Sequence, residues 1–496
     1  MDKLKMKTED VTQDKIAILK QLFPNCVREV KNVNGEIELA LDIDELRQEM
    51  SSQVVEGQQE RYQMTWPDKR AAMALANKQI TATLRPDKEK SVDFDHTKNV
   101  YIEGDNLDSL KLLRETYLGK IDVIYIDPPY NTGNDFVYED DFSQSTEEYV
   151  GNSGQYDEQG NRLVQNMESN GRFHTDWLNM IYPRLKIARD LLTSDGVIMV
   201  SINEYEVANL IKICDEIFGE KNQVCTFVWD TKKAAQGMTT ANMVVANHEY
   251  VAVYAKQLEN FKFRGLDRDE DNGFSNPDND PRGPWKRQYL QRLEQGLPKR
   301  RIVDPATGNV FEFETPYGQE KLERWIKEGR IIFPSDPTKY PARKEFLNEY
   351  ENKQQLVTSL GLYATKATTE KLYGLFDGQK VFTNPKPDTL ISFLLQQSSK
   401  EESIILDFFS GSATTAQAVM QLNSQDGGNR KFILVQINEA CEEDSVAYRA
   451  GYKTICDIGE ERIRRAGKKI MEEHPDAKID TGFRVFKLDS SNMQNA

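Results

Sequence analysis

The chain has 496 residues, of which 38% are hydrophobic and 29% charged, and its formal net charge is −16. This length exceeds what one hydrophobic core usually serves, so about two to four domains are expected. No apolar run approaches the roughly 20 residues that a membrane-spanning helix needs, and the N-terminus lacks the apolar core of a signal peptide. We therefore expect a cytoplasmic globular protein that does not contact a membrane.

The cysteines and histidines are scattered along the chain, and no two cysteines form a CxxC pair. Isolated cysteines in apolar segments are usually buried free thiols. Because structural zinc sites need clustered Cys and His ligands, the sequence predicts no metal site.

In chain order, the first predicted region is a polar and mainly helical segment over residues 1–65, with a short hairpin around Asn34 and Gly35. Oligomerisation or docking is one interpretation of this segment. Residues 66–229 then alternate between strands and helices. The apolar, β-branched runs at 121–127 and 195–203 predict buried strands, and this alternation indicates a parallel α/β sheet.

Residues 230–375 break the alternation and are rich in Asn, Asp, Gly and Pro near 266–284, so we expect a separate insert there. Residues 376–470 return to the alternation, with predicted strands at 403–409 and 430–438 on either side of a helix. Residues 471–496 form a charged tail that includes the strand-like segment GFRVFKL.

The insert contains a basic stretch that the negative net charge conceals. Trp285 and Tyr289 are interleaved with the basic side chains. The basic residues are Arg282, Lys286, Arg287, Arg292, Lys299, Arg300 and Arg301. One interpretation is a solvated basic helix followed by a loop, and the other is a surface that contacts nucleic-acid phosphates.

A first chemical motif follows the strand at 121–127, where the sequence reads Asp127-Pro128-Pro129-Tyr130. Ligand sites in open α/β sheets lie beyond the carboxyl ends of the strands. Two prolines stiffen the backbone, so the loop should present a carboxylate, a carbonyl oxygen and the tyrosine ring in fixed positions. Two acceptors can hold both hydrogens of an exocyclic amine, and the ring can stack on a base. The motif therefore favours amine methylation over an ordinary Asp-Pro turn.

A second motif, ILDFFSGSATTAQAV, places a turn of small residues between a strand and a helix. Asp407 ends the strand, and Gly411 and Ser412 let the backbone approach a ligand closely. The free N–H groups at the start of the helix suit a carboxylate or a phosphate. Such a turn is weak evidence alone and gains weight from the first motif.

Together the two motifs resemble the β-group of amino-methyltransferases, in which the acceptor motif precedes the cofactor motif. More closely, the chain resembles the modification (Mod) subunit of Type III restriction–modification systems. The matching segments include QERYQMTWPDKRAAMALAN, YIDPPYNTGNDFVYEDDF, VFTNPKPDTLI and LDFFSGSATTAQAVMQLN, and they cover most of 59–228 and 376–470.

This resemblance implies a Rossmann-like methyltransferase sheet with a circularly permuted motif order, an inserted target-recognition domain and a helical N-terminal segment. It implies methyl transfer from S-adenosyl-L-methionine to adenine N6 in double-stranded DNA after base flipping. It also implies a homodimer and a restriction subunit as partner, although family members often continue well past the segment that ends this chain at Ala496.

The resemblance also implies roles for individual residues. Asp127, Pro128, Pro129 and Tyr130 would be catalytic, and the basic stretch would contact DNA. Either Gln436 or Glu439 would hold the ribose of the cofactor. The remaining cofactor-binding residues would be Asp105, Asn106, Asp127, Lys386, Asp407, Phe409, Gly411, Ser412 and Thr414.

One departure from the family pattern is Ala413, which stands where a glycine is usual in the second motif. If this position has a positive φ, alanine strains the turn by roughly 1 kcal/mol. Two alternatives to adenine methylation stay open. The first is cytosine-N4 methylation, and the second, motivated by Ala413, is a non-catalytic DNA-binding protein on a methyltransferase scaffold.

Overall fold

The computed structural model describes residues 11–31, 37–51, 64–132, 136–138, 163–165, 172–233, 243–267, 273–292, 294–336, 338–349 and 353–490. The chain forms two compact units. The sheet unit comprises residues 1–263 and 357–496, and the insert unit comprises residues 264–356.

The sheet unit is built on a ten-stranded sheet with the strand order β18-β9-β10-β8-β5-β19-β20-β4-β21-β3. The strands from β8 to β21 in this order run parallel, whereas β10 and β3 run antiparallel to their neighbours. The strands are β3 (Ala82–Val92), β4 (Val100–Glu103), β5 (Ile121–Ile126), β8 (Leu192–Ile202), β9 (Gln223–Asp230), β10 (His248–Ala255), β18 (Ser359–Leu362), β19 (Ile404–Asp407), β20 (Lys431–Gln436) and β21 (Phe483–Ser490). The prediction of a mostly parallel α/β sheet is confirmed.

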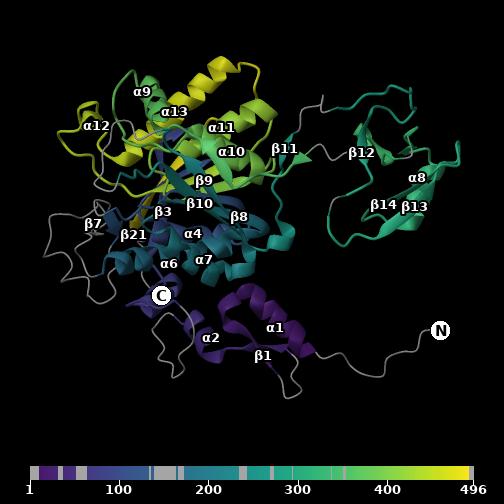
Figure 1. The fold of residues 1–496 in the computed structure, drawn as a ribbon. Helices are drawn as coiled ribbons and strands as arrows, with labels where there is room; N and C mark the ends of the chain where they lie inside the picture. Colours follow the sequence, from purple (N-terminus) through teal and green to yellow (C-terminus); the bar gives the residue numbers. More distant parts are fainter. Residues whose placement is uncertain are drawn as a thin grey trace. The chain divides into compact units, whose positions relative to one another are not determined.

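Helices cover both faces of this sheet (Figure 1). One layer contains α3 (Lys69–Asn77), α4 (Asn106–Tyr117), α6 (Phe173–Leu191) and α7 (Val207–Cys214), and the other contains α10 (Asp388–Ser398), α11 (Thr414–Asp426) and α13 (Ile455–Glu473). The short helices α9 (Thr365–Leu375) and α12 (Val446–Arg449) complete the described part of this region. Since crossovers between parallel strands are right-handed, reversing the direction of travel along the sheet moves the connecting helices to the opposite face.

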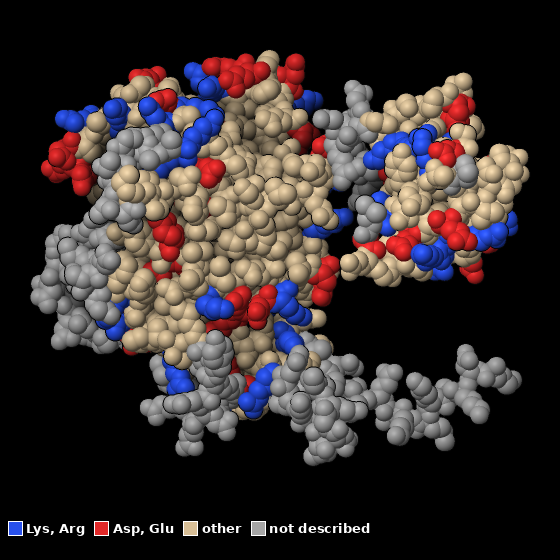
Figure 2. Space-filling view, in the orientation of Figure 1, with Lys and Arg blue, Asp and Glu red and all other residues tan. Residues whose placement is uncertain are grey.

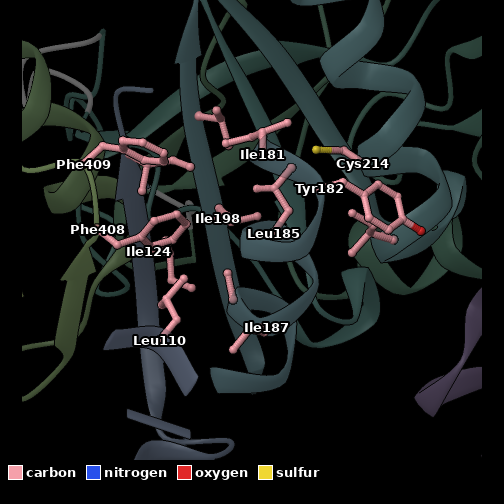
Figure 3. Close-up of a cluster of buried hydrophobic side chains, with 14 of the residues drawn as sticks. Leu110, Ile124, Ile181, Tyr182, Leu185, Ile187, Ile198, Cys214, Phe408 and Phe409 are labelled. Carbon is pink, nitrogen blue, oxygen red and sulfur yellow. The ribbon is translucent and has the colours of Figure 1, made fainter. Parts of the chain in front are cut away.

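The main hydrophobic core lies between the sheet and the layer that contains α4 and α6. Figure 3 shows Phe408 and Phe409, which follow β19, beside Ile124 of β5 and Leu110 of α4. Burying an aromatic or aliphatic side chain of this size contributes about 1.5–3 kcal/mol. These two phenylalanines therefore fix where the chain leaves β19.

The N-terminal segment contains α1 (Val11–Leu22), α2 (Ile43–Glu49) and a hairpin of β1 (Val27–Lys31) and β2 (Ile37–Leu41). The predicted hairpin is confirmed, although Asn34 and Gly35 lie outside the described residues. Arg189 of α6 donates to the Leu22 carbonyl at 2.9 Å, which satisfies an acceptor at the end of α1.

In its described residues, the insert unit has small sheets and an α-helix around a separate core that includes Phe311 and Trp325. Its elements are β11 (Leu266–Asp267), β12 (Trp285–Tyr289), β13 (Lys299–Val303), β14 (Val310–Glu314), α8 (Gln319–Lys327), β15 (Ile331–Ile332), β16 (Ala342–Phe346) and β17 (Lys353–Gln354). The interpretation of the basic stretch as a helix followed by a loop is wrong, because β12 pairs with β16 and β13 pairs with β14.

The insert unit is shorter than the expected insert of residues 230–375, because it comprises only residues 264–356. Residues 248–255 form β10, which pairs antiparallel with β8 and β9 and so extends the main sheet. Likewise, the strand-like segment near the C-terminus is β21, an interior strand between β4 and β3. Among the described residues, no helix combines the length and apolarity that a membrane span requires.

Candidate active site

The two predicted motifs meet at the topological switch point of the sheet. From β5 the chain continues through α6 to β8 on one side, and from β19 it continues through α11 to β20 on the other. Since β5 and β19 are parallel neighbours, their carboxyl ends lie side by side. A crevice opens at such a point in α/β sheets, and it is where their ligands bind.

We call residues 127–131, which follow β5, the acceptor loop. The Trp177 indole donates to the Pro129 carbonyl at 2.8 Å, and the Asn131 amide donates to the Phe173 carbonyl at 3.2 Å. Asn131 has a φ of +58° and also donates to the buried carboxylate of Glu206. Three fixed contacts therefore hold the far end of the loop against α6 and the start of α7.

Four polar side chains converge on the near end of the acceptor loop. Glu249, at the start of β10, accepts from the Tyr130 hydroxyl at 2.9 Å and from the Lys386 ammonium at 2.6 Å. Lys386 also donates to the Tyr130 hydroxyl and lies 3.4 Å from the Asp127 carboxylate. The side chain of Asp127 is 29% exposed, so this carboxylate keeps a path to an incoming molecule.

Burial and neighbouring charges shift the pKa values of Asp127 and Lys386. Burial raises the pKa of Asp127; the Lys386 ammonium opposes this rise and the Glu249 carboxylate adds to it. Burial alone would lower the pKa of Lys386, but Asp127 and Glu249 outweigh it and raise that pKa. The Lys386 ammonium thus lies between two carboxylates, those of Asp127 and Glu249.

We call residues 407–414, which begin at the end of β19, the cofactor turn. Asp407 is 2% exposed and accepts from the Phe409 N–H at 3.1 Å and from the Thr415 hydroxyl at 2.5 Å. Burial raises the pKa of Asp407 to about 7. Asp407 is therefore enclosed by its own turn, unlike Asp127.

The backbone of the cofactor turn is left-handed at two positions. Gly411 has a φ of +49°, and Ala413, at the start of α11, has a φ of +63°. The sequence predicted strain at Ala413 if this position has a positive φ, and the structure meets that condition. A side chain in this conformation costs about 1–2 kcal/mol. The Gly411 N–H donates to the side-chain oxygen of Gln436 at 2.7 Å, which joins the turn to the end of β20.

The start of α4 lies next to the cofactor turn. The Asn106 amide donates to the Phe408 carbonyl at 2.8 Å, and Asp105 caps α4 by accepting from the Asp108 N–H at 3.0 Å. The buried Arg184 pairs with Asp105 at 3.2 Å. The structure thus brings Asp105, Asn106 and Gln436 together beside the cofactor turn. Glu439 lies half-buried just beyond β20.

The seven basic residues of the insert unit do not form one uniform patch. Arg282 binds the Asp280 carboxylate with its guanidinium at 2.7 and 2.8 Å, and Lys286 lies 3.5 Å from Glu345. Register places Lys299 opposite Glu314 and Arg301 opposite Glu312. Figure 2 likewise shows basic and acidic side chains interspersed on the visible face of this unit. Arg287 is exposed and lies opposite Lys344 rather than a carboxylate. Five of the seven form no ion pair with any described residue, namely Arg287, Arg292, Lys299, Arg300 and Arg301.

Sequence reasoning missed several residues that shape the site, notably Glu249, Trp177 and Glu206. Glu249 lies 119 positions from Tyr130 along the chain, so no local spacing indicates the contact. A usable signal existed, because Glu249 is a charged residue at the start of the otherwise apolar strand HEYVAVYA. Within the described part of the chain, no three His, Cys, Asp or Glu side chains are placed to hold a metal ion.

Comparison with known proteins places this site in a family. The model of a DNA methylase family, N6_N4_Mtase, matches residues 121–447, which contain both motifs. The StyLTI Mod subunit of a Type III restriction-modification enzyme from Salmonella typhimurium is 33% identical over 87% of this chain and 67% of the relative. The EcoP15I Mod subunit from Escherichia coli is 32% identical over 97% of this chain and 78% of the relative.

Solved structures are more distant. That of the PvuII cytosine-N4-specific DNA methyltransferase aligns over 77% of this chain and 95% of its own, with 13% identity and a TM-score of 0.35. The sequence matches, by contrast, span nearly the whole chain and include the acceptor loop and the cofactor turn. The chain therefore belongs to the DNA methylase family and, within it, to the Mod subunits of Type III restriction–modification enzymes.

Proposed function

We propose that this protein transfers a methyl group from S-adenosyl-L-methionine to the N6 amine of adenine in double-stranded DNA. One observation supports this most strongly. The Pro129 carbonyl is held by Trp177, whereas within the described residues the Pro128 carbonyl accepts no hydrogen bond. The Asp127 carboxylate and the Pro128 carbonyl are then two neighbouring acceptors, which is what the two hydrogens of an exocyclic amine require.

The reaction needs alignment more than chemical activation. The amine lone pair is delocalised into the adenine ring, and holding both hydrogens lets the lone pair face the electrophile. The sulfonium of the cofactor supplies the methyl group directly, so no covalent enzyme intermediate is required. Asp127 takes up or passes on the proton that the methylated amine releases, and Tyr130 stacks on the base after it has left the duplex.

The residues of the cofactor turn fit this cofactor. Gly411 allows close approach, and the buried Ser410 hydroxyl has no partner among the described residues, so it is free for a ligand. Because Gln436 is engaged with the Gly411 N–H, we assign the ribose hydroxyls to Glu439. Asp105, Asn106, Phe409, Ser412 and Thr414 would line the same site, and Asp407 would hold the turn in shape.

We assign target recognition to the insert unit, with Arg287 as the principal phosphate contact. Arg287 is exposed on β12, two positions from Tyr289, which is 56% exposed. Each phosphate contact changes the slope of log affinity against log salt by about 0.9. Arg287→Gln should reduce this slope by about one, whereas the exposed Lys327→Gln on α8 should not change it. Equal slopes in both variants would remove the assignment.

The Mod-subunit relatives belong to restriction-modification enzymes, which suggests a restriction subunit as partner here. The resemblance also suggests a homodimer in which one copy reads sequence while the other flips the base. Light scattering of the purified protein measures whether it forms a dimer, and the same measurement with a candidate restriction subunit shows whether the two bind. A monomer that binds no restriction subunit would contradict both suggestions.

The proposed chemistry is tested by digesting DNA that the purified protein has methylated and identifying the modified nucleoside by mass. We expect N6-methyladenine, since Asp rather than Ser precedes the prolines. N4-methylcytosine would show that the same geometry serves the other exocyclic amine. Absence of cofactor binding by calorimetry would instead favour a non-catalytic DNA-binding protein.

A further inference from the structure

A buried guanidinium lies directly beneath the cofactor turn. Arg462 of α13 is 2% exposed, and its Nη1 donates to the Ser412 hydroxyl at 2.7 Å and to the Thr414 hydroxyl at 2.6 Å. Helix α13 comes this close because Gly459 has no side chain: a Cβ there would lie 3.2 Å from the Gly411 carbonyl oxygen.

In the described part of the chain, the positive charge of Arg462 is not matched by a carboxylate in contact with it. Among the described residues, no carboxylate forms an ion pair with it, and Asp388 is the acidic group that acts on it from further away. Burial lowers the pKa of Arg462 to about 10, so it is still charged at neutral pH. An isolated buried charge is unfavourable by several kcal/mol unless an anion offsets it.

The hydrogen bonds of Arg462 also leave hydroxyl donors of the cofactor turn free. A guanidinium can only donate, so the Ser412 and Thr414 oxygens accept from Arg462 and their own hydrogens are available. The Ser410 hydroxyl is also buried and has no partner among the described residues. The Ser412 and Thr414 hydroxyls, which accept from the same guanidinium nitrogen, can therefore both donate to one acceptor with a positive charge behind them.

The competing cation is Lys386, which the resemblance counts among the cofactor-binding residues. In the structure its ammonium is held by Glu249 at 2.6 Å and by the Tyr130 hydroxyl, and it lies 3.4 Å from Asp127. These contacts commit Lys386 to the acceptor loop. The cofactor turn then needs another source of positive charge.

We propose that Arg462 is a positioning residue that supplies this charge, and that it binds the carboxylate of the cofactor's methionine part through the hydroxyls of Ser412 and Thr414. The inference rests on the proposed function, because it assumes that this turn holds S-adenosylmethionine. It adds a residue to the cofactor site that neither motif contains.

Calorimetry with two ligands isolates the amino-acid part of the cofactor, which carries the carboxylate. S-adenosylhomocysteine carries it, whereas 5′-methylthioadenosine keeps the nucleoside and the sulfur but lacks the amino-acid part. Arg462→Gln should weaken S-adenosylhomocysteine binding by about tenfold or more, as for loss of a charge-assisted contact, and leave methylthioadenosine binding unchanged. If both ligands weaken equally, or neither does, Arg462 only supports the fold of the turn and the proposal is wrong.

Matched variants separate charge, fold and the competing cation. Lys468→Gln removes a positive charge from the exposed face of α13 and should change neither affinity. Arg462→Lys keeps the charge and should retain part of the preference for S-adenosylhomocysteine, which tests the proposal even if the glutamine variant unfolds. Lys386→Met should keep the preference for S-adenosylhomocysteine over methylthioadenosine. If Lys386→Met lost this preference while Arg462→Gln kept it, the carboxylate would be assigned to Lys386. A wild-type protein that binds neither ligand would contradict the proposed function itself.

Discussion

The acceptor loop and the cofactor turn follow adjacent parallel strands, and each begins with an aspartate, yet the two carboxylates have opposite surroundings. Asp127 is 29% exposed and lies beside Lys386, whereas Asp407 is 2% exposed and is bonded to its own turn. The same position in the sheet therefore provides an available acceptor in one case and an internal brace in the other. The surroundings differ because Asp127 meets Lys386 from a distant part of the chain, whereas Asp407 bonds to the residues that follow it.

Removing the available carboxylate should cause the greatest loss of activity. Asp127→Ala removes one of the two proposed amine acceptors, so we expect methyl transfer to fall by at least about a thousandfold, at the upper end for a lost electrostatic contact. Cofactor affinity should remain, because the cofactor turn keeps its own hydrogen bonds. Single-turnover methylation and calorimetry measure the two quantities, and a fully active variant would remove the mechanism.

A smaller loss is expected at the residue that keeps Asp127 available. In Glu249→Gln the Lys386 ammonium loses its carboxylate partner and should move toward Asp127, which occupies the proposed amine acceptor. Hydrogen bonds to charged groups contribute about 1.5–3 kcal/mol, so kcat should fall by roughly ten- to hundredfold. His248→Gln, the neighbouring residue on the opposite face of β10, should stay near the wild-type kcat.

A double-mutant cycle tests how Glu249 acts. Glu249 accepts from the Tyr130 hydroxyl, so Glu249→Gln and Tyr130→Phe share an interaction and their effects on kcat should not add. Strictly additive losses would show that Glu249 acts without Tyr130.

Changing the enclosed carboxylate of Asp407 should affect the stability of the protein more than its catalysis. The pKa of Asp407 is raised from its ordinary 3.8 to about 7 by burial, so its contribution to stability is complete at low pH and is lost as pH rises toward 7. A pKa that is higher by one in the folded state corresponds to roughly 1.4 kcal/mol of free energy of unfolding. Asp407→Asn cannot ionise, so its free energy of unfolding should fall less than that of the wild type between pH 4 and 7. Parallel curves in denaturant titrations would contradict this assignment.

Relief of strain in the cofactor turn should change the protein least. Ala413 has a φ of +63°, where glycine has no steric penalty, so Ala413→Gly should stabilise the protein by roughly 1 kcal/mol or less. Ala416→Gly, in the regular part of α11, is the matched control and should destabilise by about the same amount. A loss of stability at both positions would show that Ala413 is not strained in solution.

The sequence predicted much of this fold because its signals are local. The apolar run before Asp127 and the small residues after Asp407 are legible within a few positions, and both strands and both motifs are where they were expected. The strain at Ala413 also followed from one position. Local patterns of this kind cannot give long-range partners: Glu249 meets Tyr130 from another strand, and Arg462 meets Ser412 from a helix 50 positions further along the chain.

The basic stretch was the least predictable region. Its residues were assigned by composition, but their availability depends on pairing that only the folded strands define, such as Arg301 opposite Glu312. Composition alone therefore could not show which of these basic residues pair with carboxylates. Strand register shows that Lys299 and Arg301 lie opposite carboxylates, whereas Arg287 lies opposite Lys344.

Asp127 is the residue on which the proposed methyl transfer to adenine N6 depends most. Its role can be tested by methylation-sensitive sequencing of DNA from cells that express either the wild-type protein or Asp127→Ala. We expect N6-methyladenine at one recurring sequence with the wild type and none with the variant. Methylated cytosine at that sequence, or equal adenine methylation by both proteins, would contradict this role.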